Sequence, residues 1–267
     1  MRLALSTLGV PGMPVADAAR LAADGGFHGL ELRAHPQEPV HTGLPPGERA
    51  DTVAICRDAG VEILAVAGSV RVAQPGEDEQ VLEEAAALLE LARDLGAPCA
   101  RVFPGAAADA GRDTSADTLA VRRLCAVARI AADTGVRVLL ETHDSHARGA
   151  DVARVLEGVR RREVGAVWDV MHTWRAGEDP ADTFAHLAPY LGHVQVKDIA
   201  SRDDIAPLPP GSGVLPLADT TDLLMRADWD GWLCWEYEKR WYPQAPALSS
   251  VLDAGREHLL RLLSAAA

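Results

Sequence analysis

Basic residues are scarce in this sequence. Its 267 residues include 26 Lys and Arg against 39 Asp and Glu, which gives a formal net charge of −13. Nucleic acids and anionic membranes are bound through a positive field, so this charge balance argues against either partner. The segment 1–11 is interrupted by glycine and proline before an apolar signal core forms, and no apolar run approaches the ~18 residues of a membrane span. We therefore expect a soluble, cytoplasmic protein.

Cysteine is scarce as well, and its four residues are widely spaced: Cys56, Cys99, Cys125 and Cys234. None of them belongs to a C-x-x-C pair, so we expect reduced thiols that are buried in the fold of a cytosolic protein. A Gly-rich phosphate loop is also missing. The sequence therefore leaves open whether a substrate carries phosphate.

A recurrent Asp-x-Gly element divides the chain into units of similar length. It occurs at 24–26, 58–60, 94–96 and 133–135, and each copy precedes an apolar, strand-like run. A glycine at this point suits a left-handed helix cap that leads back into a sheet. The copies are 34 to 39 residues apart, which is the length of one β/α unit with its loops.

Apolar strand-like runs alternate with helical periodicity along the whole chain. The expected strands are 2–6, 29–33, 61–67, 98–103, 136–140, 164–169, 192–196 and 231–235. The expected helices are 14–22, 47–59, 77–95, 117–134, 151–159, 182–190, 217–226 and 249–263. This alternation predicts an α/β fold, a single (β/α)8 TIM barrel. No shift in composition marks a second domain, so we expect one domain over 1–267.

Oxygen-bearing side chains stand at the ends of four of these strands. They are Glu141, Asp169, Gln195 and Glu236. Catalytic groups of a (β/α)8 barrel lie at the C-terminal ends of its strands, so these four should converge. Helix capping or solvation would explain any one of them alone, but three neighbouring carboxylates repel each other unless a cation lies among them. Hard oxygen donors predict a divalent metal, Mn²⁺ or Mg²⁺ rather than zinc.

Such an ion would polarise a carbonyl and stabilise the enediolate that forms when the adjacent C–H proton is lost. Glu141 and Glu236 are the candidates for acid and base. His172, three residues after Asp169, is placed to bind a substrate oxygen. His143 either lines the pocket or is an ordinary loop residue.

Lys197 shares its strand face with Gln195, so it either contacts substrate and neutralises the acids or forms a structural ion pair. Trp174, Trp241 and Tyr242 are candidates for an apolar wall over a sugar ring. We expect Trp235, which alternates with Glu236, to face the helices instead.

Several motifs resemble the sugar phosphate isomerase/epimerase group of the xylose isomerase-like barrel superfamily. They are E-T-H (141–143), W-D-x-x-H (168–172), H-V-Q-V-K-D (193–198), G-W-L-C-W-E-Y-E (231–238) and G-F-H-G-L-E-L-R (26–33). The group includes ketose 3-epimerases, hydroxypyruvate isomerase and inosose dehydratase. The resemblance covers almost the whole chain and is specific for the superfamily rather than for one substrate.

This resemblance implies roles for individual residues. Glu141, Asp169, Gln195 and Glu236 match the metal ligands, Glu141 and Glu236 match the pair that moves protons, and His172 matches a substrate-binding histidine. The third ligand is commonly histidine in the family, and Gln195 is a weaker ligand than imidazole. Ala147 stands where the ketose 3-epimerases carry a further glutamate, which argues against a free-ketose 3-epimerase.

The sequence thus predicts a metal-dependent isomerase or epimerase acting on a sugar, keto-sugar or polyol derivative. A lyase on the same scaffold is the alternative, because the same enediolate can expel a β-substituent. A non-catalytic binding barrel is less favoured. A phosphodiesterase of the endonuclease IV type is also less favoured, since it needs a His-rich multi-zinc site and a basic groove. Substrate identity and any homo-oligomer stay open.

Overall fold

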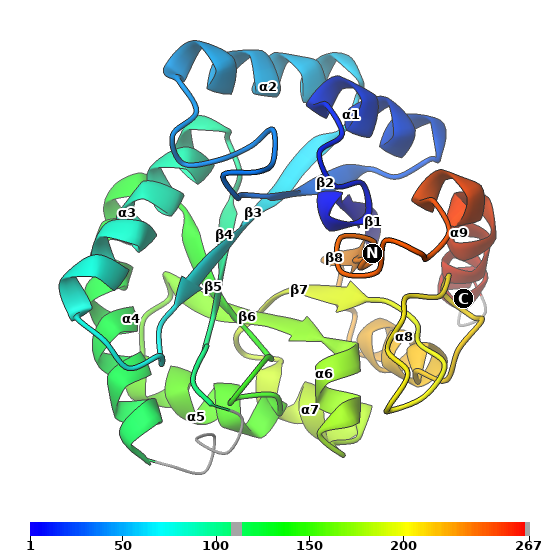
Figure 1. Cartoon of the computed structure of the whole chain (residues 1–267). Helices are drawn as coiled ribbons and strands as arrows, with labels where there is room; N and C mark the ends of the chain where they lie inside the picture. Colours follow the sequence, from blue (N-terminus) through cyan, green and yellow to red (C-terminus); the bar gives the residue numbers. More distant parts are fainter. Residues whose placement is uncertain (108–113, 265–267) are drawn as a thin grey trace.

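The strands form a closed barrel. The computed structural model describes residues 1–107 and 114–264, and in it each strand pairs in parallel with the next along the chain, while β8 returns to β1. The helices surround this barrel (Figure 1). The strands are β1 (Arg2–Ser6), β2 (Gly29–Arg33), β3 (Glu62–Arg71), β4 (Cys99–Phe103), β5 (Arg137–Glu141), β6 (Val164–Asp169), β7 (Leu191–Val196) and β8 (Trp232–Trp235). The predicted (β/α)8 barrel is confirmed.

The helices follow the expected order. Two features near the site differ from the expectation: one additional helix and one longer strand. They are α1 (Val15–Asp24), α2 (Pro46–Asp58), α3 (Asp78–Asp94), α4 (Thr114–Thr134), α5 (Gly149–Val159), α6 (Val170–Arg175), α7 (Pro180–Leu187), α8 (Leu217–Arg226) and α9 (Leu248–Ser264). The short helix α6 was not expected. Strand β3 also runs on to Arg71, because it pairs with β4 again at Phe103 after a register shift.

The repeated glycines have the predicted backbone conformation. Gly26, Gly60, Gly96 and Gly135 have φ angles of 68°, 74°, 68° and 73°. A positive φ is strained for residues with a side chain, so glycine lets the chain leave each helix and enter the next strand within a few residues. The prediction drawn from the Asp-x-Gly repeat is therefore confirmed.

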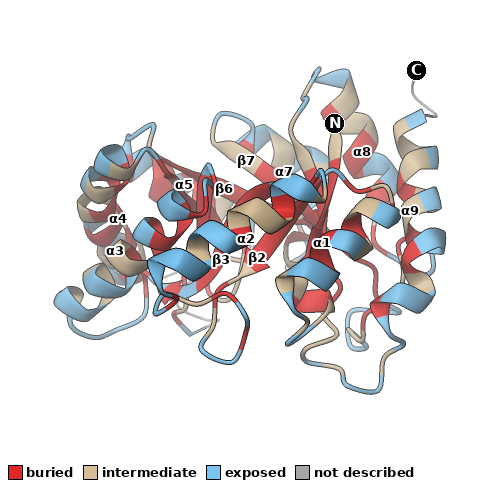
Figure 2. Ribbon diagram, turned by 90° about the horizontal axis from the view of Figure 1, so that it is seen from above, coloured by how far each residue is buried: buried red, intermediate tan, exposed pale blue. Residues whose placement is uncertain are grey.

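The barrel strands separate two apolar layers. Outward-facing side chains, such as the fully buried Trp168 and Trp235, pack beneath the helices, whereas a small inner cluster contains Ala4, Cys99, Leu139, Val167 and Cys234. Figure 2 shows the buried strands inside and the exposed faces of the helices outside. All four cysteines are free, and three are buried, with Cys125 only partly so. No helix in the described ranges is long and apolar enough to cross a membrane.

Helix α9 closes on β8 through a glycine. A Cβ atom at Gly255 would overlap the ring of Trp235, which is fully buried and has no room to move. This contact also confirms that Trp235 faces the helices. A Cβ at Gly47, in contrast, would meet no atom within 4 Å.

We therefore expect Gly255→Ala to lower the free energy of unfolding by about 1–3 kcal/mol, the usual cost of overpacking. Gly47→Ala makes the same chemical change in a helix and should be neutral or slightly stabilising. Urea denaturation of both variants tests this expectation. Equal stabilities for the two variants would contradict the packing of α9 on β8.

Candidate active site

The barrel interior changes from apolar to polar toward the C-terminal ends of the strands. Side chains two residues apart on a strand share a face, so Leu139 is followed inward by Glu141 and Val167 by Asp169. Inward-facing side chains of the other strands also change from apolar to polar toward the C-terminal end. Together they form a buried polar layer on the C-terminal side of the apolar one. That layer contains Ser6, Glu31, Arg101, Glu141, Asp169, Gln195 and Glu236.

Glu141 is held by an arginine. Arg101 Nε lies 2.9 Å from Glu141 Oε2, and its Nη1 donates to the carbonyl of Gly68 at 2.8 Å. The guanidinium also stacks on Phe103, with its central carbon 3.8 Å from the ring centroid. Burial raises the pKa of Glu141 above its ordinary value, although the charge of Arg101 opposes this shift.

Lys197 lies among three other carboxylates. Its Nζ is 2.7 Å from Asp169 Oδ2 and 2.7 Å from Glu238 Oε1, and it donates a short hydrogen bond to Glu236 Oε2. Lys197 is only 2% exposed, so its ammonium group has exchanged water for these acids. Although burial favours the neutral amine, the three carboxylates raise the pKa of Lys197 well above its ordinary value.

The acids around Lys197 differ in their protonation. Burial raises the pKa of Glu236 to about 8; the charge of Lys197 opposes this shift, and the neighbouring Glu141 and Glu31 add to it. Burial acts on Asp169 in the same direction, but there Lys197 and His172 outweigh it and hold the pKa below its ordinary value. The site therefore pairs a carboxyl that readily holds a proton with one that stays ionised.

Asp169 has a second structural role. Its Oδ1 accepts hydrogen bonds from the backbone N–H groups of Met171 and His172 at 2.8 and 3.2 Å, so it caps helix α6. Helix capping and a place in the polar layer are thus combined in one side chain. The cap places His172 over the barrel, where burial lowers its pKa to about 3 and leaves the imidazole neutral.

Gln195 is oriented by Glu31. Its Nε2 donates to both oxygens of Glu31, at 3.2 and 3.1 Å, and to Glu236 Oε1 at 3.3 Å. Glu31 is fully buried and also contacts His193 Nε2 at 3.0 Å. Because the amide nitrogen is engaged, Gln195 Oε1 is left buried without a hydrogen-bond partner. An unpaired buried acceptor of this kind suits a cation ligand.

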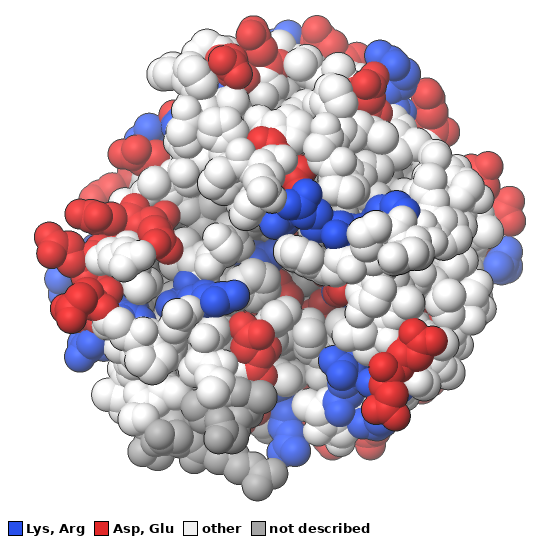
Figure 3. All heavy atoms as spheres, in the orientation of Figure 1, with Lys and Arg blue, Asp and Glu red and all other residues white. Residues whose placement is uncertain are grey.

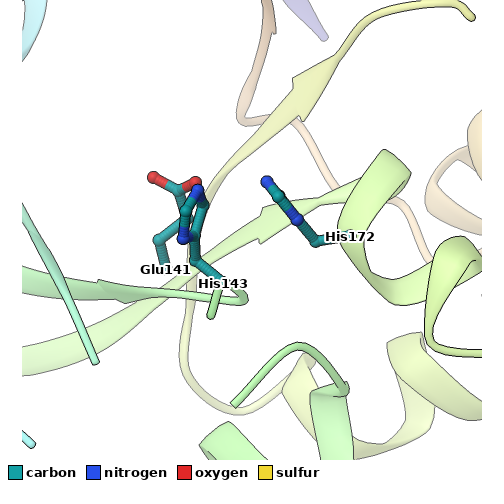
Figure 4. Close-up of side chains that lie close together, drawn as sticks. All are labelled: Glu141, His143 and His172. Carbon is teal, nitrogen blue, oxygen red and sulfur yellow. The ribbon is translucent and has the colours of Figure 1, made fainter. Parts of the chain in front are cut away.

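A second cluster lies beside the polar layer. Ligand atoms of Glu141, His143 and His172 all lie within 4.8 Å of one another. No other group of three His, Cys, Asp or Glu residues in the described part of the chain is as close. Figure 4 shows the three side chains close together, with the two histidines above β5 and α6. The imidazole rings are 4.1 Å apart. His143 therefore belongs to the site region rather than to a distant loop.

One cavity of about 270 Å³ opens onto part of this region. Glu141, Glu236 and His143 line it, together with Glu238 and Trp241. The other four predicted site residues are not among its walls; they are Asp169, Gln195, His172 and Lys197. The structure thus brings all seven residues to one end of the barrel but exposes only some of them to the cavity.

The chemistry of the oxygen donors suits a hard divalent cation, although Glu141, Asp169 and Glu236 do not come as close together as Glu141, His143 and His172. Gln195 Oε1 has no partner, and Asp169 Oδ2 and Glu141 Oε2 have no hydrogen bond besides their ion pairs. Lys197 is the competitor, because its ammonium group already neutralises Asp169 and Glu236. Glu238, which lies outside the predicted ligand set, also contacts Lys197 and would remain its partner.

Three residues of the site were not assigned from the sequence: Glu31, Arg101 and Glu238. A signal for the first two exists, since each is a charged residue within an otherwise apolar strand of a parallel barrel. Such a residue is buried and must find a partner of opposite charge. The partner of Arg101 lies on the neighbouring strand β5, whereas those of Glu31 lie across the barrel on β7.

A closed (β/α)8 barrel with buried acids at the C-terminal ends of its strands is the arrangement of barrel enzymes. The chain belongs to the xylose isomerase-like TIM barrel family, whose model matches residues 19–261. The superfamily resemblance seen in the sequence is therefore confirmed.

Two curated relatives and one solved structure illustrate the range of the family. The chain is 27% identical over 259 residues to a Streptomyces coelicolor protein named "Putative hydroxypyruvate isomerase", with 89% of this chain and 90% of the relative covered. It is 26% identical over 190 residues to a 3-dehydroshikimate dehydratase of Bacillus anthracis, covering 70% and 67%. The structure of the IolI protein with a zinc atom superimposes with a TM-score of 0.84 at 15% identity, covering 100% and 99%.

Removal of Lys197 should make the fold depend on a cation. We expect Lys197→Met to lose about 3–5 kcal/mol of stability, the usual cost of unpairing a buried charge. Added Mn²⁺ should restore part of that loss, and thermal melting with and without the ion measures it. Arg2→Met, which breaks an exposed pair with Glu62, should change little and should not respond to Mn²⁺. A Lys197→Met protein as stable as wild type would contradict this account.

Proposed function

We propose that the protein is a divalent-metal-dependent isomerase or epimerase of a small sugar, keto-sugar or polyol derivative. It would move a proton on the carbon next to a carbonyl. The observation that carries this proposal is that Glu141 and Glu236, which extend from β5 and β8, line the same cavity. Two carboxyl groups on different strands can remove a proton and return one to the neighbouring position or face.

The ion pairs of Glu141 and Glu236 determine which carboxylate oxygen of each residue is available for proton transfer. Lys197 occupies Glu236 Oε2, so Oε1 is the atom left for proton transfer, with only a 3.3 Å hydrogen bond from Gln195. Arg101 occupies Glu141 Oε2 in the same way. These cations keep the carboxylates in place and limit the charge that accumulates when a proton moves.

The proposed ligands are Glu141, Asp169, Gln195 and Glu236, with Mn²⁺ or Mg²⁺ as the ion. The oxygen donors of this set, and above all the unpaired Oε1 of Gln195, support it. The neighbouring nitrogen donors His143 and His172 offer a different set with Glu141. A bound divalent ion would polarise the substrate carbonyl and stabilise the negative charge of the enediolate.

Three further residues are proposed to bind substrate. His172 is neutral and can donate one hydrogen bond and accept another, and His143 lines the cavity beside Glu141. Lys197 contacts Glu236, one of the two glutamates proposed to move the proton, and is proposed to contact an anionic oxygen of the substrate. The acidic net charge and the four free cysteines support a cytoplasmic enzyme with a small-molecule substrate and no nucleic-acid partner.

A lyase is the second candidate. The similarity to a 3-dehydroshikimate dehydratase over 70% of the chain favours it. The first step would be the same proton removal by a glutamate, after which a hydroxyl on the β-carbon leaves as water. The substrate, rather than the glutamates, would then decide between reprotonation and elimination.

Solvent-proton exchange tests the proposal. Purified protein, loaded with Mn²⁺ or Mg²⁺, is incubated in D₂O with a panel of small hydroxy-ketones and keto-acids and followed by NMR and mass spectrometry. We expect deuterium beside the carbonyl of one substrate, and a fall of about 10²- to 10⁴-fold in that rate in Glu141→Gln and Glu236→Gln. Glu257→Gln, 65% exposed on α9, is the matched control and should exchange like wild type.

The product identifies the reaction. A product of unchanged mass indicates an isomerase or epimerase, and a product lighter by one water indicates a lyase. Exchange that is unaffected by either glutamate substitution would contradict the assigned roles. Exchange that persists after complete removal of divalent ions would contradict the proposed metal dependence.

A further inference from the structure

The cavity is lined by side chains of both charges. Its lining includes Glu141, Glu236 and Glu238 as well as three arginines: Arg101, which is paired with Glu141, and Arg33 and Arg71. Arg33 and Arg71 come from the ends of the adjacent strands β2 and β3. In Figure 3, acidic atoms lie within the central hollow of this face and basic side chains stand at its rim. This separation occurs although the whole chain carries a net charge of −13.

Arg33 lies in a cluster of two arginines, Arg33 and Arg240, and one glutamate, Glu38. Its Nη1 donates to Glu38 Oε1 at 2.8 Å, and Arg240 Nη1 lies 3.8 Å from the same oxygen. Two arginines therefore share one acid. Burial lowers the pKa of Arg33, and although Glu38 opposes the shift, the charges of Arg240 and Arg101 add to it. The other guanidinium donors of Arg33 form no hydrogen bond with a described residue.

The side chain of Arg71 is fixed in position, but its guanidinium forms no ion pair with a described residue. Its backbone pairs with Phe103, and a Cβ atom at Gly105 would overlap its stem, so the side chain lies flat against that glycine. The guanidinium donates to Gln74 Oε1 at 3.3 Å. It forms no ion pair with a carboxylate of residues 1–107 or 114–264, although its charge helps to lower the pKa of Asp144, after the larger effects of burial and of His143. An arginine that is held by its stem at a cavity wall, and that uses one donor for Gln74 but forms no ion pair with a described residue, is suited to a planar anion.

We propose that Arg33 and Arg71 form a binding site for an anionic group, a carboxylate or a phosphate, on the substrate. This inference rests on the proposed function in one respect, namely that the ligand is also the molecule whose proton is moved. The anion would bind at the β2 and β3 side of the cavity, which places the rest of the molecule toward Glu141 on β5 and Glu236 on β8. The substrate class is then an acidic or phosphorylated hydroxy-carbonyl compound rather than a neutral sugar.

The size of the cavity agrees with such a ligand. Its volume is about 270 Å³, and a water molecule takes about 30 Å³ of liquid. A small acid fits this space. Trp241, which is 57% exposed and lies under the Arg33 guanidinium at 5.5 Å, adds an apolar edge next to the anion site.

Calorimetric binding of three related probes tests the proposal: D-glycerate, glycerol 3-phosphate and neutral glycerol. EDTA is present, so that a carboxylate cannot bind through a metal. A charge-assisted hydrogen bond corresponds to a change in Kd of about tenfold or more. We expect at least one anionic probe to bind wild-type protein about tenfold more tightly than glycerol, and the better of the two anions identifies carboxylate or phosphate as the source.

Variants then assign the preference to the arginines. Arg71→Gln should bind the anion and glycerol alike, and Arg71→Lys should keep part of the difference. Arg162→Gln, 95% exposed and outside the cavity, removes the same charge and should behave as wild type. Because Arg71 is exposed, its loss should leave the melting temperature unchanged, which is checked for each variant.

Three results would overturn the proposal. They are anionic probes that bind no better than glycerol, no anion binding up to the solubility of the probes, and an anion preference that survives Arg71→Gln. These outcomes are independent of catalysis. An anion preference in a protein that shows no proton exchange would support the binding site and reject the proposed function, and the opposite pair of results would do the reverse.

Discussion

The ammonium group of Lys197 balances the charge of this site. Asp169, Glu236 and Glu238 all contact it in a part of the barrel that excludes water. Carboxylates this close together repel each other, and their burial is tolerated only when a cation lies among them. Arg101 does the same for Glu141 on the other side. The fold thus supplies its own cations where a divalent ion is expected.

The remaining contacts follow from this constraint. Asp169 uses one oxygen for Lys197 and the other to cap α6, which brings His172 over the site. Glu31 engages the nitrogen of Gln195 and leaves its Oε1 unpaired. Each of these side chains is fixed by a neighbour, so the site is preorganised. A divalent ion would need only to take carboxylates from Lys197, which keeps Glu238.

The sequence predicts the barrel and the position of the acids because both depend on local patterns. The glycine repeat defines the β/α units, and the residue at a strand end must lie at the barrel rim. The cationic partners of these acids are harder to predict from the sequence. The pairing of Lys197 with Glu236, or of Arg101 with Glu141, joins residues about 40 apart in the chain and depends on how neighbouring strands align. Helix α6 is only six residues long, too short for helical periodicity to reveal.

The position of the bound ion tests the central claim most directly. Anomalous diffraction from a crystal grown with Mn²⁺ locates the metal without reference to activity. The proposed ligand set predicts a peak bonded to Glu141, Asp169, Gln195 Oε1 and Glu236, with the ammonium group of Lys197 turned to Glu238. A peak at Glu141, His143 and His172, or no peak with Lys197 still between Asp169 and Glu236, would contradict the account.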